Sequence, residues 1–144
     1  MKTIEMTAEE LGQAVQALGE LMKESRPVRL GLALRRVARQ VQPAAKDAAE
    51  MEREIVERHA RRDERGEPVP GHDADGTPRP GTVEIADPAA CHAELDALRR
   101  TRMQVEVAPL TLDDFADAGP DVAPWVLAAL GELIDDTPSE TRAA

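Results

Sequence analysis

The side chains best suited to metal binding or nucleophilic chemistry are one cysteine and three histidines. Cys91 and His92 are adjacent on a predicted helix and therefore point in different directions, while His59 and His72 stand apart in the sequence. No pair follows the C-x-x-C or H-x-x-x-H spacing of a zinc site. We therefore expect no metal site at these residues.

The segment His72-Asp-Ala-Asp75-Gly76 places alternating carboxylates before a glycine, as at the start of a calcium-binding loop. Such a loop is closed by an acidic side chain about six residues after the glycine. Thr82 and Val83 occupy that region, so the simpler interpretation of this segment is a solvated turn.

No catalytic set of residues can be assembled from the sequence. The chain has only two serines, Ser25 and Ser139, and both lie beside the expected ends of elements. It has neither the G-x-G-x-x-G pattern nor the Walker phosphate loop. We predict that the protein is not an enzyme and needs no cofactor.

Two features could bind a partner. The apolar stripe of the predicted second helix is flanked by Arg35, Arg36 and Arg39, together with Arg29. These arginines could form a phosphate-binding patch, and the simpler interpretation is that they make ion pairs on a solvated flank of the helix. Trp125 is the only tryptophan, and core packing is the simpler alternative to a role as a partner anchor. Arg35, Arg36, Arg39 and Trp125 are the candidate partner-binding residues.

The composition bounds the fold class. The 144 residues suit a single domain, 1–144, and the aromatic content of 1% favours helices packed on helices.

The net charge of -10 is uneven, because residues 1–65 hold 13 Lys and Arg against 12 Asp and Glu, whereas residues 66–144 hold 5 against 16. A single cysteine and the lack of a signal-like or membrane-spanning apolar run favour the cytoplasm, and nucleic-acid binding is disfavoured by charge.

The N-terminal part, 7–61, predicts a helical hairpin. Thr7-Ala-Glu-Glu10 is a capping box, followed by an apolar stripe of Leu11, Val15, Leu18 and Met22. After Pro27 a second stripe, Leu30, Leu34, Val37 and Val41, continues past Pro43 as Ala44, Ala48, Met51 and Ile55. One long helix kinked near Val41 is favoured over two abutting helices.

The remaining chain predicts a minor β element within a mainly α fold. Residues 62–81 form a Pro/Gly/Asp-rich loop, and no internal repeat is evident. In the 82–134 part, strands at 82–85 and 103–107 would flank a helix that begins after Asp87, giving a strand-helix-strand unit. An apolar helix with Pro124 in its first turn follows Asp121, and the tail, 135–144, is expected to be disordered.

Three stretches carry a family resemblance: RPVRLGLALRRVARQVQP, EREIVERHARRDERGEPV and MQVEVAPLTLDDFADAG. Their helix caps and apolar spacing are similar to those of a group of small tailed-bacteriophage proteins of unassigned function. The inserted PGHDADGTPRPG stretch departs from that pattern. The resemblance spans most of the chain and implies no catalytic residue.

Three functions compete. The leading hypothesis is a non-enzymatic phage-type accessory protein that contacts a virion or host protein, or itself, in virion assembly or as a minor virion component. It would reside in the host cytoplasm or the virion. The second is an acidic inhibitor of a host defence or transcription protein, and the third is a DNA-binding regulator that uses the arginine-flanked helix.

Overall fold

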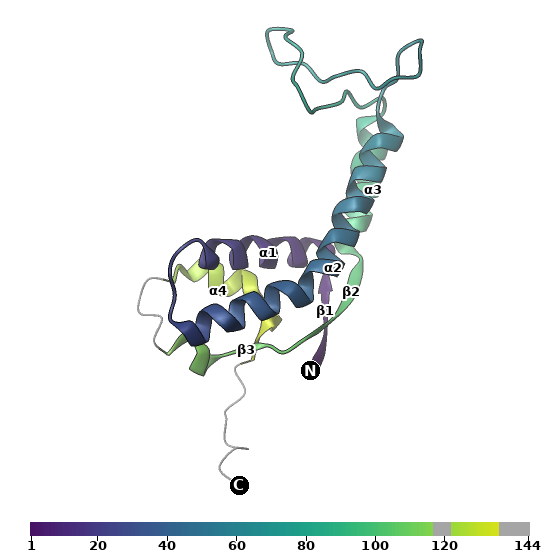
Figure 1. Ribbon diagram of the computed structural model, residues 1–144. Coiled ribbons are helices and arrows are strands. Elements are labelled where there is room, and N and C mark those ends of the chain that lie inside the picture. Colours follow the sequence, from purple (N-terminus) through teal and green to yellow (C-terminus); the bar gives the residue numbers. More distant parts are fainter. Residues whose placement is uncertain (117–121, 136–144) are drawn as a thin grey trace. The chain divides into compact units, whose positions relative to one another are not determined.

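The computed structural model describes residues 1–116 and 122–135 (Figure 1). This part of the chain is mainly helical with a small strand component, which confirms the predicted fold class. Its α-helices are α1 (Ala8–Met22), α2 (Val28–His59), α3 (Pro88–Arg100) and α4 (Pro124–Leu130). Among these described residues, no helix is long and apolar enough to cross a membrane.

The chain divides into two compact units. Unit 1 comprises Met1–Lys46 and Arg102–Ala144, and unit 2 comprises Asp47–Thr101. The helix α2 contributes residues to both units and continues through Pro43, so the alternative of two abutting helices is wrong. The helical hairpin of 7–61, the kink near Val41 and the single domain stay predictions.

A two-stranded antiparallel sheet closes one side of the unit 1 core. Strand β1 (Lys2–Thr7) pairs with β2 (Arg102–Val107), with Ile4 opposite Val105 and Lys2 opposite Val107. Alternate residues face inward because side chains alternate across a strand. The buried side chains of the sheet are Ile4, Met6, Val105 and Val107.

The helices of unit 1 contribute most of the core side chains, which are small or branched apolar residues. Thr7 caps α1 by accepting a hydrogen bond from the Glu10 N–H, as the capping box predicted. In Figure 1, α1 and α4 lie side by side within this unit. The helical residues buried in the core are Leu11, Ala14, Ala17, Leu18, Leu21, Leu30, Ala33, Leu34, Val37, Val41, Val126 and Leu130.

The predicted apolar stripes are confirmed on the first part of α2 and only partly on α1. Leu30 and Leu34 are fully buried, but Val15 and Met22 are 39% and 43% exposed. Ala14, Ala17 and Leu21 take core positions instead, so the buried face of α1 is rotated from the predicted stripe. Spacing alone predicted an apolar face but not its direction.

The predicted strand-helix-strand unit is wrong. The strand expected at 103–107 is present as β2, but its partner is β1, which the sequence analysis missed. Residues 82–85 contribute only an isolated bridge between Ile85 and Ala60. The helix between them is confirmed as α3, with Asp87 accepting a hydrogen bond from the Ala90 N–H.

The C-terminal part of unit 1 is shorter in helix than predicted. Parallel strands β3 (Leu110–Thr111) and β4 (Ile134–Asp135) pair, and a capped 3-10 helix, Leu112–Phe115, follows β3. The helix α4 ends at Leu130 and is followed by a 3-10 turn, Gly131–Leu133. Gly119, Pro120, Asp121 and the tail from 136 onward lie outside the described residues.

Unit 2 contains α3 and the later residues of α2, with a turn-rich segment between them. Its buried apolar side chains are Ile55, Ala60 and Cys91, whereas Met51, which was predicted to be on the apolar stripe, is 45% exposed. Backbone hydrogen bonds join three stretches of the segment, from Arg61 N to Glu84 O (2.7 Å), Val69 N to Arg61 O (2.8 Å) and Glu84 N to Val69 O (2.8 Å).

The turn-rich segment contains an internal repeat that the sequence analysis did not find. The pattern D-x-x-G-x-P occurs at 63–68 and again at 73–78. Each copy forms the same turn, in which the first aspartate's N–H donates to the carbonyl four residues later and Gly66 or Gly76 donates back to that aspartate's carbonyl. Both glycines have positive φ, which an L side chain would strain.

Candidate functional site

An apolar groove lies in unit 1 between α1 and the first part of α2. Its cavity volume is 760 Å³. We call it the α1–α2 groove and define it by its lining residues. They are Val15, Leu18, Gly19 and Met22 of α1, and Leu32, Arg35, Ala38, Arg39, Val41, Gln42 and Ala45 of α2.

The groove arises because each helix carries more apolar residues than its core face can bury. On α2 the core stripe includes Leu30 and Leu34, and Leu32 falls between them on another side of the helix. Leu32 is 64% exposed, and Val15 and Met22 face the same groove from α1. A contiguous exposed apolar surface of this kind is typical of an interaction site.

A second hollow of 300 Å³ continues the groove past the α1–α2 connection. It shares Met22, Leu32 and Arg35 with the groove and adds Val28, which is 77% exposed. Val28 and Leu32 are four residues apart and therefore lie on one face of α2. The sequence signal that could have revealed this surface is a second apolar pair beside the main stripe.

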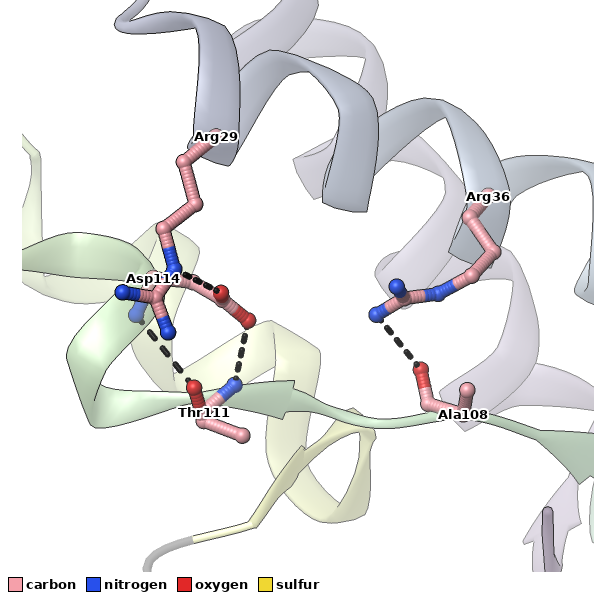
Figure 2. Close-up of polar contacts among 5 residues, drawn as sticks. All are labelled: Arg29, Arg36, Ala108, Thr111 and Asp114. Carbon is pink, nitrogen blue, oxygen red and sulfur yellow. Dashed lines mark hydrogen bonds and ion pairs between the residues drawn. The ribbon is translucent and has the colours of Figure 1, made fainter.

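Two of the four clustered arginines are used within unit 1. Arg29 Nε donates to Asp114 Oδ1 at 3.2 Å, and Arg36 Nη2 donates to the Ala108 carbonyl at 3.3 Å (Figure 2). Asp114 also accepts from the Thr111 N–H at 2.8 Å, so Arg29 joins the capping box of the 3-10 helix. Arg29 and Arg36 therefore hold α2 to the chain that follows β2.

The other two arginines line the groove. Arg35 and Arg39 are exposed, and neither makes a hydrogen bond or ion pair with any residue in 1–116 or 122–135. They are four residues apart, so their side chains start from one face of α2, about 6 Å apart along its axis. The groove thus combines an apolar floor with two cationic groups that have no intramolecular partner in the described residues.

Trp125 lies on α4 and is 50% exposed, so the simpler prediction that it packs in the core is wrong. It is not among the residues that line the α1–α2 groove. Leu127 on the same helix is 41% exposed, which leaves both side chains accessible to solvent. The partner-binding role of Trp125 stays a prediction for a surface separate from the groove lining.

The residues considered for metal chemistry have other local roles. Cys91 is buried, and His59 Nε2 lies 3.3 Å from Glu94 Oε1 without hydrogen-bond geometry. Asp73 accepts from the Arg79 guanidinium at 2.8 Å. Within the described ranges, no group of three or more His, Cys, Asp or Glu side chains is placed to hold a metal ion.

Asp75 belongs to the second repeated turn. The Thr77 N–H donates to Asp75 Oδ1 at 3.0 Å. This backbone hydrogen bond, followed by one from the Thr77 side chain, holds the pKa of the Asp75 carboxyl below its ordinary value. The carboxylate that resembled a calcium ligand in the sequence therefore stabilises its own turn.

No protein-family model, curated protein or solved structure matches the chain.

Proposed function

We propose that the chain is a non-enzymatic, phage-type accessory protein that acts by protein-protein contact in virion assembly or as a minor virion component. The contact surface is the α1–α2 groove, which receives a helical segment of a partner protein. The observation that carries this proposal is the exposure of Val15, Met22 and Leu32 around a 760 Å³ groove in the unit that holds the main core.

The groove has the dimensions and chemistry of a helix-binding surface. Its lining on α2 runs from Leu32 to Ala45, a span of roughly 20 Å at about 1.5 Å per residue. A helix that lies between two others can place its apolar residues against both, as in helix-in-groove recognition. Burying a side chain such as Leu32 contributes about 1.5–3 kcal/mol before the entropic cost of association.

The other parts of the proposal rest on the sequence. The absence of a catalytic constellation in the sequence supports a non-enzymatic role. The phage-type assignment is supported by the resemblance of three stretches, within 26–43, 52–69 and 103–119, to small tailed-bacteriophage proteins. The first of these stretches contains all the groove-lining residues of α2 except Ala45.

Affinity capture from infected or source cells tests the proposal. The tagged wild-type protein is compared with Leu32→Asp, which places a charge in the groove, and with Met51→Asp, which changes an exposed residue of unit 2. Mass spectrometry is performed across a range of salt concentrations and on purified particles. We expect wild type and Met51→Asp to recover capsid or tail proteins at high salt, and Leu32→Asp to lose them.

Two results would contradict the proposal. Recovery of the same proteins by Leu32→Asp, with the variant still folded by circular dichroism, would remove the groove from the contact. A wild-type protein that stays monomeric and is absent from particles would remove the virion role. Salt-sensitive recovery of a basic host protein would instead favour the acidic-inhibitor function.

A further inference from the structure

We infer that the partner segment in the α1–α2 groove is an acidic amphipathic helix. Two of its carboxylates, one helical turn apart, pair with Arg35 and Arg39, and its backbone passes close to Gly19. This inference rests on the proposed function, because it specifies the chemistry of the segment that the groove receives.

The charge of the partner follows from the two arginines. Both line the groove, and within residues 1–116 and 122–135 neither has a hydrogen bond or ion pair. A partner that lay against the apolar floor would partly desolvate the guanidinium groups, which is unfavourable unless they gain acceptors. Arginine forks match carboxylates bidentately, so acidic side chains at the edge of the partner's apolar face meet this requirement.

The spacing of the carboxylates follows from the helix. Arg35 and Arg39 are separated by four residues, about one turn of α2. A partner helix that runs along α2 presents side chains with the same rise, so acidic residues at positions i and i+4 can reach both arginines. Its apolar residues, at i, i+3, i+4 and i+7 of the facing stripe, contact Leu32, Met22 and Val15.

The path of the partner's backbone is indicated by Gly19. This glycine lies in the interior of α1, where glycine disfavours helix relative to alanine. A Cβ built at Gly19 meets no atom within 4 Å, so packing within the described structure does not require glycine there. Because Gly19 also lines the groove, the missing side chain gives a bound segment room for close approach of its backbone.

Two other occupants are less compatible with these observations. A basic helix would meet Arg35 and Arg39 with like charge. A second copy of this chain, related by a two-fold axis with grooves facing, would bring the same two arginines toward their own counterparts. The repulsion of an acidic partner by the chain's net charge of -10 is weak, because charges more than about 8 Å apart are largely screened at physiological salt.

A displayed library of helical peptides tests the inference on the full chain. Each peptide spans about 14 residues, the length needed to match the groove, with leucines at i, i+3, i+4 and i+7 and randomised flanking positions. Selection on wild type is followed by counter-selection on Leu32→Asp, which retains only peptides that need the groove. We expect Asp or Glu to be enriched at flanking positions four apart.

Charge reversal makes the expectation specific. Selection on Arg35→Glu/Arg39→Glu should shift the same positions toward Lys and Arg. The acidic peptides should bind this variant at least about tenfold more weakly than wild type. Raising the salt concentration should reduce binding of acidic peptides to wild type only in part, since the ion pairs at the groove rim are screened while the apolar contacts of the floor remain.

Gly19→Ala and its matched control, Gly12→Ala, test whether the backbone of the bound segment passes close to Gly19. A Cβ at Gly12 also meets nothing within 4 Å, but Gly12 is not among the groove-lining residues. Both substitutions should raise the melting temperature because alanine favours helix. Gly19→Ala should weaken the selected acidic peptides by about tenfold or more, whereas Gly12→Ala should leave their affinity unchanged.

The outcomes separate this inference from the proposed function. Groove-dependent peptides with neutral or basic flanks, or equal affinities for Gly12→Ala and Gly19→Ala, would overturn the inference and leave helix docking intact. Failure to recover any peptide that depends on Leu32 would overturn both. Self-association of the wild-type chain that is lost in Leu32→Asp would assign the groove to a second copy and overturn the acidic partner.

Discussion

Unit 1 and unit 2 are stabilised in different ways. Unit 1 contains the main core, a set of buried apolar side chains from α1, α2, α4 and the β1–β2 sheet. In unit 2 the buried apolar residues are Ile55, Ala60 and Cys91. Its turn-rich segment is held by backbone hydrogen bonds, side-chain hydrogen bonds and ion pairs such as Arg79 to Asp73. The ion pair between Arg58 and Glu94 joins α2 to α3.

The α1–α2 groove lies on unit 1, whose larger core is better able than that of unit 2 to hold a binding surface in a fixed shape. A binding surface formed by two helices keeps its geometry only if their opposite faces are well packed. Leu18 and Val41 illustrate this coupling, because both belong to the core and also line the α1–α2 groove. Unit 2, with fewer buried contacts, is expected to open more readily.

The largest expected effect comes from emptying the core of unit 1. Leu30→Ala removes a fully buried side chain and should lower the free energy of unfolding by about 2–5 kcal/mol. Ile55→Ala, in the smaller buried cluster of unit 2, should lower the free energy of unfolding by an amount near the lower end of that range. Hydrogen exchange should show loss of amide protection in unit 1 for Leu30→Ala and in unit 2 for Ile55→Ala.

The control for this prediction is Leu32→Ala, two residues from Leu30 on the same helix. Leu32 is exposed, so its truncation should change the free energy of unfolding by no more than about 0.5 kcal/mol. Equal loss of protection in both units after either core substitution would contradict the comparison and indicate one cooperative domain.

Removing a helix cap should lower the free energy of unfolding by less than a core substitution, and by more in unit 1 than in unit 2. Asp114→Ala removes an acceptor for the Thr111 N–H and an ion pair with Arg29, so we expect a loss of about 1–2 kcal/mol. Asp87→Ala removes one hydrogen bond, from the Ala90 N–H, and should lower the free energy of unfolding by about 0.5–1 kcal/mol. Urea denaturation of both variants checks the order. A larger loss from Asp87→Ala would show that the α3 cap contributes more than its single contact predicts.

The ion pair of unit 2 should contribute less. Arg58 Nη1 lies 3.1 Å from Glu94 Oε2, and both side chains are substantially exposed. A double-mutant cycle with Arg58→Ala and Glu94→Ala should give a coupling energy of about 0.2–1 kcal/mol that decreases with added salt. A coupling above about 2 kcal/mol that is insensitive to salt would require a desolvated pair.

The smallest expected effect is the titration of Asp75. Because its folded pKa is lowered, ionised Asp75 stabilises the turn at pH values above the unfolded pKa, and this contribution is lost as the pH falls through the folded pKa. A carboxyl NMR titration should find a midpoint below that of an ordinary aspartate. Thr77→Val, which keeps the N–H and removes the hydroxyl, should restore only part of the shift. An ordinary midpoint in wild type would mean that the turn does not form.

Local features of the fold could be predicted from the sequence. The caps at Thr7 and Asp87 were predicted correctly, because each depends on a side chain and an N–H three residues away. The antiparallel pairing of β1 with β2 was missed, because it joins residues about a hundred positions apart. The alternation of Ile4 and Met6 with polar residues was the available signal for β1.

The groove could not be predicted because it depends on which side of each helix meets the core. Val15 and Met22 fit the helical spacing of a core stripe, yet Ala14 and Leu21 occupy the core positions. Arg35 and Arg39 were identified as partner-binding candidates, but so was Arg36, which contacts the Ala108 carbonyl. Only the tertiary arrangement distinguishes an arginine that is used internally from one that is not.

Site-specific photo-crosslinking tests the groove most directly. A photo-reactive amino acid replaces Leu32 in the groove, Trp125 on α4 or Met51 in unit 2, each an exposed side chain. We expect position 32 to cross-link, in the producing cells, to an acidic helical segment of one partner protein, with only background yield from position 51. No cross-link at position 32, or a strong cross-link from position 125 alone, would contradict the assignment of the α1–α2 groove as the contact surface.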